Sequence, residues 1–531
     1  MDDRIGAWAV RAVGRSALLV DAGDQVPSIL AARFAAAADL RGVTPADIVV
    51  GAATFLVVGG DPPAMAGISE VLRQLPRTTG EPDSGDDDAS EIEIPVRYDG
   101  EDLDEVAGLV ELTTDEVVAR HSGATYRAAF MGFAPGFAYL AGLPEELVVG
   151  RRSQPRSVVP AGSVAIADIY SAVYPRSTPG GWHLLGTTDA VLFESDRRPP
   201  ALLTAGARVR FVGGSRRRRD AVTSAPTPSA RPSARPGPEG GATLDVVDPG
   251  PLTTVQDRGR PGHGGEGVPP SGAADGHSAA LANRLVGNDE DAAVLETTMT
   301  GPKLRLAGPA STGRTVAVTG AVVPVTVDGM GRGLNAPFDL GAGQVVELGS
   351  ASAGLRSYIA VSGGLDVPAV LGSRSTDLLS GLGPPVLRAG DVLAVGPDRG
   401  RRPGVDVAPV AAMAASPVVL HVRLGPRADW LTDDGRRLLA SAEWTVTPAS
   451  NRVGVRLEGP ALDRSRRREL QPEGLVTGAM QLTPSDELVV FGPDHPVTGG
   501  YPVLGVVDDT DLGVVAQLRP GDTVRLQADG P

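Results

Sequence analysis

One stretch of this chain, residues 215–241, constrains the fold more than any other, because it divides the sequence into two parts. It reads SRRRRDAVTSAPTPSARPSARPGPEGG. Such a Pro, Ser, Arg and Gly composition is typical of a linker, since it offers few apolar side chains to bury. We therefore predict a disordered linker over residues 214–242. Each flanking part carries motifs of its own.

Composition narrows the kind of protein. The 531 residues are enough for roughly three or four domains. There is no cysteine, which excludes disulfides, thiolate catalysis and Cys-ligated metals. A formal charge of −15 argues against a nucleic-acid partner, which would need a basic face. No apolar run reaches the ~18–20 residues of a membrane span and no signal peptide is apparent, so we expect a cytoplasmic protein with no membrane partner.

The basic residues and histidines exclude further kinds of site. Lys303 is the only lysine, and its context TGPKLRL is neither a P-loop nor a biotinylation site. Arginine cannot replace lysine as the amine that carries biotin. No Ser stands in a G-x-S-x-G elbow, which argues against a serine hydrolase. No metal site is predicted, because metal-ligand spacing is absent from the six histidines His121, His183, His263, His277, His421 and His495.

The strand and turn pattern predicts a mainly β protein with a small α+β domain at its N-terminus. Aromatic residues are only 4% while there are 69 Gly and 46 Pro, which suits short strands joined by turns. We expect the α+β domain over residues 1–90, one closed barrel over 91–213, and a module of two barrels over 243–531, divided near residue 405.

A partial repeat supports three barrels built on one plan. A Gly-Gly pair followed by an apolar residue recurs three times, and each copy precedes a small-Gly turn that enters a strand. The copies are Gly180-Gly181-Trp182, Gly363-Gly364-Leu365 and Gly499-Gly500-Tyr501.

The motifs on the two sides resemble a known pair of proteins. Residues 1–213 resemble the B subunit of bacterial 5-oxoprolinase, also called allophanate hydrolase subunit 1, through FAPGFAYL at 133–140, VPAGSV at 159–164 and PGGW at 179–182. Residues 243–531 resemble the C subunit, or allophanate hydrolase subunit 2. Its motifs are QDRGR at 256–260, SGAAD at 271–275, VGN at 286–288, GGLDVPAVLGSRST at 363–376, NRVGVRLEGP at 451–460 and TGGYP at 498–502.

This resemblance implies a fusion protein made of tandem cyclophilin-like β-barrels. The same modules form the biotin-dependent carboxyltransferase part of urea carboxylases, and one pair is known as a kinase inhibitor and its antagonist. The chain departs from the family at Asp168-Ile169-Tyr170, where Gly-Gly is usual, and at Ala274, where Met is usual. Both changes could alter the choice of substrate.

Candidate substrate-binding residues of the first part lie in two glycine turns. The turn at Phe133, Pro135, Gly136 and Phe137 is either one wall of a ligand pocket or a structural corner of the barrel. The turn at Pro179, Gly180, Gly181 and Trp182 offers backbone N–H groups to an anion and an indole for stacking. Its alternative is a hairpin that requires positive φ.

In the second part, polar residues gather in Gly-rich loops, where such residues are more often functional. Asp275 is the candidate general base or the group that orients an amide N–H. Arg260 is the candidate for holding a carboxylate or phosphate. We add Gln256, Asp257 and Ser271 as substrate-binding residues, and we expect Gln256, Arg260 and Asp275 to face the two glycine turns of the first part. A buried Arg–Asp network is the alternative, as it is for Asn451, Arg452 and Arg456.

The leading functional hypothesis is the B–C component of an ATP-dependent 5-oxoprolinase, a hydrolase that opens the cyclic amide of 5-oxoproline to glutamate. The resemblance implies a separate A subunit and ATP with Mg²⁺, at a site that the sequence does not locate. One alternative is the carboxyltransferase component of a urea carboxylase-like enzyme, whose biotin carboxylase and carrier are other chains. A further alternative is a non-enzymatic inhibitor of a histidine kinase. A homo-oligomer is left open.

Overall fold

The computed structural model describes residues 3–76, 91–214, 241–309, 313–401, 404–412, 416–468 and 470–528. The predicted linker therefore lies almost entirely outside the described residues. The described parts confirm a mainly β protein with a small α+β domain and two closed β-barrels. Within these ranges, no helix is long and apolar enough to cross a membrane.

The N-terminal domain is one antiparallel sheet with two helices. Its strands follow the order β1-β2-β3-β5-β4, with bounds β1 Asp3–Ile5, β2 Trp8–Val13, β3 Ala17–Asp21, β4 Asp47–Val50 and β5 Thr54–Val58. The helices α1 (Pro27–Asp39) and α2 (Pro62–Gln74) each begin with proline, which suits the first helical turn. Asp61 caps α2 by accepting a hydrogen bond from the backbone N–H of Ala64 at 2.8 Å.

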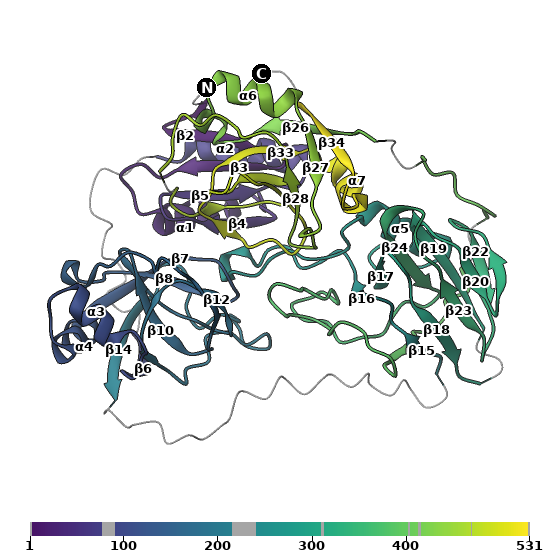
Figure 1. Cartoon of the computed structure of the whole chain (residues 1–531), viewed down its shortest axis with the longest axis horizontal. Helices are drawn as coiled ribbons and strands as arrows, with labels where there is room; N and C mark the ends of the chain where they lie inside the picture. The colour runs from purple at the N-terminus through teal and green to yellow at the C-terminus, as the bar shows by residue number, and fades with distance from the viewer. Residues whose placement is uncertain are drawn as a thin grey trace.

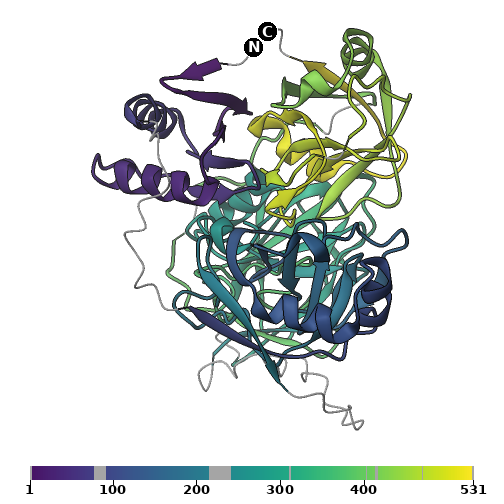
Figure 2. The ribbon, with the colours of Figure 1, turned by 90° about the vertical axis from the view of Figure 1, so that its left-hand side faces the viewer.

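Both faces of this sheet are covered. Successive residues of a strand point to opposite faces, and in β3 Leu18 and Val20 pack with the helices while Ala17 and Leu19 pack elsewhere. Their partners include Leu475, Ala479 and Phe491, which belong to the far end of the chain. The N-terminal domain is thus joined to the C-terminal barrel by an apolar core, and the two lie side by side in both views (Figure 1, Figure 2).

The first barrel closes in the order β10-β11-β8-β7-β14-β6-β13. Its strands are β6 Ile92–Arg97, β7 Thr125–Met131, β8 Ala138–Ala141, β10 Ser163–Ala167, β11 Tyr170–Val173, β13 His183–Thr187 and β14 Arg208–Gly214. The helices α3 (Leu103–Leu109) and α4 (Thr114–Gly123) pack beside it, and Thr113 and Glu116 form the expected capping box of α4. A separate ribbon pairs β9 (Arg156–Val159) with β12 (Thr178–Gly180).

The last barrel repeats this plan with the order β26-β33-β30-β31-β28-β27-β34. Its strands are β26 Val418–Leu424, β27 Glu443–Val446, β28 Gly454–Glu458, β30 Ala479–Leu482, β31 Leu488–Phe491, β33 Val503–Val507 and β34 Thr523–Ala528. In both barrels the final strand lies parallel to the first, and an irregularity falls at the equivalent point, Val164/Ala165 and Met480/Gln481. Both barrels also carry a two-stranded ribbon that contains the Gly-Gly motif, here β29 (Glu473–Gly474) with β32 (Thr498–Gly499).

The prediction of a third closed barrel is wrong for the unit between them. It forms two sheets, β21-β20-β23-β18-β15-β25 and β16-β17-β24-β19-β22. Its first strand β15 pairs antiparallel with its last strand β25, whereas the first and last strands of the closed barrels pair parallel. The bounds are β15 Thr243–Asp248, β16 Thr253–Gln256, β17 Val294–Thr298, β18 Lys303–Ala307, β19 Arg314–Val322, β20 Val325–Val327, β21 Met330–Arg332, β22 Pro337–Leu340, β23 Val345–Leu348, β24 Ala353–Val361 and β25 Val392–Ala394.

Three further helices belong to the second half of the chain. α5 (Gly276–Leu285) packs on β19 and β24 of the middle unit. α6 (Asp433–Ser441) lies against β34 of the last barrel, and α7 (Leu512–Gln517) lies against β24. α7 therefore connects the last barrel with the middle unit.

Candidate functional site

The turn between β7 and β8 lies where the first barrel meets the second half of the chain. Phe133 and Gly136 both have positive φ, 65° and 77°. The backbone N–H of Gly136 donates to the carbonyl of Glu266 at 3.0 Å. A Cβ on Gly132 would lie 1.8 Å from the hydroxyl of Thr498, so only glycine permits this approach. The aromatic–glycine turn is thus a contact surface between the two halves.

Pro135 and Phe133 take part in this contact to different degrees. A Cβ on Gly267 would lie 3.5 Å from Cα of Pro135. Phe133 is 36% exposed, and its ring contacts those of Phe137 and Tyr174. The exposed ring of Phe133 leaves it available to a ligand.

The second glycine turn is built into the first barrel. Trp182 is buried and packs edge-on against Phe137 and Tyr139, with ring centroids 5.7 and 5.5 Å apart. Gly180 lies in β12, where a Cβ would be 2.4 Å from the hydroxyl of Tyr174. Gly180 therefore has a packing reason to be glycine, and a ligand could stack on the indole only if this aromatic cluster rearranged.

Asp257 positions the loop that faces the junction between the halves. One of its carboxylate oxygens accepts from the hydroxyls of Ser373 and Ser375 at 2.6 and 2.5 Å, and the other accepts from the backbone N–H of Arg374 at 2.5 Å. These hydrogen bonds hold the segment that leads into Thr376. The role of Asp257 in this geometry is to position the loop.

Arg260 presents a buried donor that has no acceptor. The residue is 2% exposed, and its Nη2 donates to the carbonyl of Ser375. Its Nη1 is buried without a hydrogen-bond partner in the described part of the chain. Burial lowers the pKa of Arg260, although the carboxylate of Asp377 acts to raise it. Because buried donors are nearly always satisfied, Nη1 has the capacity to donate to an acceptor that the described protein atoms do not supply, such as a water molecule or a ligand.

Two neighbouring polar atoms are equally unsatisfied. The amide nitrogen of Gln256 donates to the carbonyl of Thr376 at 2.9 Å, while the amide oxygen of Gln256 and the hydroxyl of Thr376 lack partners among the described residues. The hydroxyl of Ser271 lies 3.3 Å from the same carbonyl and 2.9 Å from the carboxylate of Asp494. These contacts connect Gln256 to the last barrel.

A buried arginine holds Asp494 in place. Arg452 donates to both carboxylate oxygens of Asp494 at 2.9 Å, to Glu296 at 2.5 Å and to the carbonyl of Gly272 at 2.7 Å. Although burial opposes its charge, Glu296 and Asp494 raise the pKa of Arg452. Arg452 thus belongs to a buried Arg–carboxylate network, as the structural interpretation of this residue predicts.

His495 is the functional candidate that sequence reasoning missed. Its Nδ1 donates to the carbonyl of Pro496 at 2.8 Å, and burial lowers the pKa of His495, so the ring is neutral and Nε2 carries a lone pair. This Nε2 is buried and has no partner in the described ranges. The available signal is its position directly after Asp494 and just before the TGGYP motif. Because His495 has no metal-ligand spacing to another histidine, a search for such spacing does not select it.

The first barrel reaches the same loop through Arg176. Its Nη1 donates to the carbonyl of Leu379 at 2.6 Å. Asp377, two residues earlier, accepts from the backbone N–H groups of Leu379 and Ser380 at 2.9 and 3.0 Å. Burial raises the pKa of Asp377, and the charge of Asp494 adds to this effect. A buried carboxyl group with a raised pKa therefore lies in the loop that Arg176 of the first barrel contacts.

Asp275 has the geometry of a helix cap. Its carboxylate accepts from the backbone N–H and the hydroxyl of Ser278, at 3.0 and 2.6 Å, and from the amide of Gln517 at 2.9 Å. Its own backbone N–H donates to the hydroxyl of Tyr358 at 2.7 Å. Asp275 thereby connects α5 to α7, and its catalytic role stays a prediction.

We call this group the junction site; hydrogen bonds connect its members to residues 375–376 or to one another, except for His495, which directly follows Asp494 in the sequence. It combines one free guanidinium donor, one hydroxyl and two free acceptors within a buried network, which suits a small molecule that carries both an amide and a carboxylate. Its members are Gln256, Arg260, Ser271, Thr376, Asp494 and His495. Across the described residues, no group of three His, Asp or Glu side chains is placed to hold a metal ion.

Comparison with known proteins assigns both halves. Residues 8–203 match the carboxyltransferase domain, subdomain C and D, and residues 266–528 match subdomain A and B. The 5-oxoprolinase B subunit of Bacillus subtilis is 48% identical over 124 residues, which are 23% of this chain and 52% of that protein. The 5-oxoprolinase C subunit of Escherichia coli is 33% identical over 286 residues, covering 53% of this chain and 90% of that protein.

A urea amidolyase of Lachancea kluyveri is 34% identical over 309 residues, covering 53% of this chain, yet the match spans only 17% of that enzyme. Among solved structures, TTHA0988 is 33% identical with a TM-score of 0.83, covering 96% of this chain and 99% of that one. The chain therefore belongs to the carboxyltransferase-domain family and joins, in one polypeptide, the modules found in the B and C subunits of 5-oxoprolinase.

Proposed function

We propose that this chain is the B–C component of an ATP-dependent 5-oxoprolinase, which opens 5-oxoproline to glutamate together with a separate A subunit. One observation carries the proposal: the two halves are similar to the B and C subunits of that enzyme, and the match covers 90% of the C subunit of Escherichia coli. The match to the urea amidolyase covers 17% of that enzyme.

The junction site fits the chemistry of this substrate. 5-Oxoproline carries a carboxylate, which the free Nη1 of Arg260 could bind, and a lactam N–H, which could donate to Nε2 of His495. Ring opening adds one water across the C–N bond, and the nitrogen gains the proton. Hydrolysis of ATP, with Mg²⁺, would supply the driving force by activating the lactam oxygen.

Access to these atoms requires movement, since Arg260 and His495 are each only 2% exposed. The turn at residues 132–137 packs against residues 266–267 and Thr498, beside the junction site. Displacement of this turn would open a path between the halves. Substrate entry along such a path would require both modules.

The decisive experiment is an assay of ATP-dependent glutamate release by the chain mixed with an A subunit. We expect release only in the complete mixture, and a fall of about 10²-fold or more for His495→Gln. His421→Gln is the matched control, because His421 is on the exposed surface of the last barrel. Absence of glutamate release from the complete mixture would refute the proposal.

The second candidate is a carboxyltransferase that acts on urea or a related amide, which the 34% identity to a urea amidolyase favours. Biotin would have to arrive on another chain, since Lys303 is the only lysine and forms an ion pair with Glu347 at 2.9 Å. Carboxylation of urea by this chain with a biotin carboxylase and carrier, without glutamate release, would select this candidate.

A further inference from the structure

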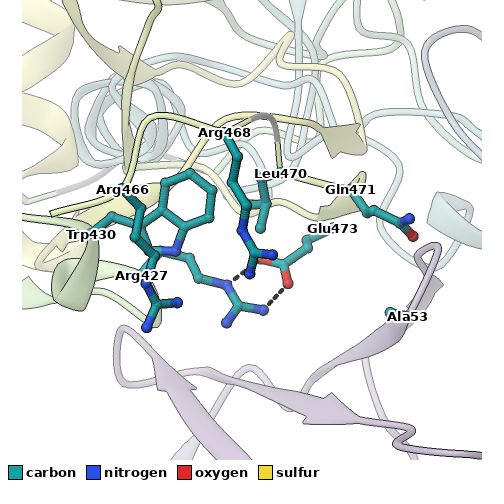
Figure 3. Close-up of a pocket in the computed structure, with 8 residues that line it drawn as sticks. All are labelled: Ala53, Arg427, Trp430, Arg466, Arg468, Leu470, Gln471 and Glu473. Carbon is teal, nitrogen blue, oxygen red and sulfur yellow. Dashed lines mark hydrogen bonds and ion pairs between the residues drawn. The ribbon is translucent and has the colours of Figure 1, made fainter. Parts of the chain in front are cut away.

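A cavity of about 390 Å³ lies between the N-terminal domain and the last barrel, apart from the residues of the junction site. Ala53 contributes from the N-terminal domain, and the other lining residues come from the last barrel (Figure 3). The backbone N–H of Ala52 donates to the carbonyl of Pro472 at 2.9 Å, which fixes the two walls. At about 30 Å³ for each water molecule, the cavity is large enough for an organic ligand. We call it the arginine pocket.

Three guanidinium groups face this pocket from two segments. Arg427 is neutralised, because its Nε donates to Glu473 at 2.9 Å and its Nη2 donates to the same carboxylate. Arg466 lies 3.3 Å from Asp429, in a pair whose side chains are both nearly half exposed. Arg468 has no ion-pair partner among the described residues. Three positive and two negative side chains therefore leave an excess of one positive charge.

A buried donor points to a ligand independently of these charges. Trp430 is 4% exposed and lines the pocket beside Arg427 and Arg466 (Figure 3). Its Nε1 is buried and has no hydrogen-bond partner in the described chain. The indole nitrogen can only donate, and an acceptor on a bound ligand would satisfy it.

We propose that the arginine pocket binds a small organic phosphate. A phosphate monoester presents three terminal oxygens and a charge of about −1.5 to −2 at neutral pH. Three donors with spare capacity, Arg466, Arg468 and the indole of Trp430, match these oxygens better than they match the two of a carboxylate. The apolar side chains of Leu470 and Ala53 leave room for the organic part.

The pocket is connected to the junction site through one ribbon. Glu473, in its wall, pairs with Gly499 in the β29–β32 ribbon, and Gly474 pairs with Thr498. Thr498 follows His495 by three residues and contacts Gly132 of the first barrel. A ligand that orders this wall would therefore also order the segment that carries His495.

The test is calorimetric titration of the full chain with inorganic phosphate, pyrophosphate, ADP and glutamate. We expect the phosphate probes to bind and ADP to bind most tightly, with glutamate silent. Arg468→Ala should weaken ADP binding at least about tenfold, as expected for a lost charged hydrogen bond. Trp430→Phe, which retains the ring without the donor, should weaken it less.

Arg467→Ala is the matched control, since it removes the same charge from the same exposed segment without touching the pocket. Equal effects of Arg467→Ala and Arg468→Ala would reduce the result to general electrostatics and overturn the site. Unchanged ADP affinity in Arg468→Ala, or binding of glutamate alone, would also overturn it. The titration needs neither an A subunit nor turnover. Its outcome is therefore independent of whether the chain has the proposed enzymatic activity.

Discussion

Replacing Arg452 by methionine should destabilise this protein more than any surface change, because Arg452 lies at the centre of a buried ion network. Its side chain is 1% exposed and makes four hydrogen bonds, two of them to Asp494 and one each to Glu296 and Gly272. Methionine fills a similar volume but leaves both carboxylates without their main partner. The network joins the middle unit to the last barrel, so both should lose stability.

The expected cost is about 3–5 kcal/mol, the range measured when one partner of a buried ion pair is removed. For a unit of this size it corresponds to a fall in Tm of about 6–20 °C. The difference in unfolding free energy between the wild-type protein and Arg452→Met should become smaller as the pH falls. In the intact protein, although burial opposes it, Arg452 and Arg356 lower the pKa of Glu296. Without Arg452 that pKa rises, because burial then acts with less opposition, so protons neutralise the unpaired carboxylate as the pH falls.

Urea unfolding followed by tryptophan fluorescence measures this change, because Trp430 and Trp444 both belong to the last barrel. The matched control is Arg456→Met, whose half-exposed pair with Glu487 should contribute no more than about 1 kcal/mol. A loss for Arg452→Met that equals the control, or one that does not shrink at low pH, would refute the reasoning.

Three further changes test other parts of the structure. Gly132→Ala should loosen the contact between the halves, because its Cβ would lie 1.8 Å from the hydroxyl of Thr498. Gly123→Ala is the control and should be neutral, since nothing lies within 4 Å of its Cβ. Limited proteolysis of both variants measures the difference. Asp275→Asn should cost about 1–3 kcal/mol in unfolding free energy through mismatched hydrogen bonds, with turnover per folded molecule unchanged if Asp275 only braces the loop. Burial lowers the pKa of His121 to about 3. Between pH 7.5 and 5.5 the unfolded chain therefore binds a proton at His121 and the folded barrel does not. The free energy of unfolding should fall by about 1.4 kcal/mol over this range. Urea titrations of the wild-type protein and of His121→Gln at both pH values would show this difference.

Short-range spacing predicts most of the fold. The capping box at Thr113 and Glu116, the α+β N-terminal domain and the two barrels with matching Gly-Gly ribbons all follow from local patterns. The third Gly-Gly copy is misleading, because Gly363 serves a different close approach, in which a Cβ would lie 2.3 Å from the carbonyl of Gly396. Sequence spacing does not reveal which backbone a glycine will meet.

Local sequence patterns predict only part of the candidate site. The Gly-rich loops predict functional roles for Gln256, Arg260 and Ser271, and the structure brings these residues together. Thr376 and His495 come from segments more than 100 residues away in the sequence, and their free atoms are visible only once the partners of each side chain are known. The burial that distinguishes them is a property of tertiary packing.

The apolar core shared by the N-terminal domain and the last barrel should hold the two halves together without a covalent connection. The N-terminal domain buries Leu19 and Leu56 against the last barrel, although these elements lie at opposite ends of the sequence. Residues 3–214 and 241–528, produced as separate chains in one cell, should therefore co-purify. Leu19→Asp should abolish this, because a charge would enter the shared core, whereas Leu109→Asp, at a position that is 59% exposed, should not. Fusion would then serve to keep both halves at high effective concentration. Halves that separate on gel filtration would show instead that the covalent connection is what maintains the interface.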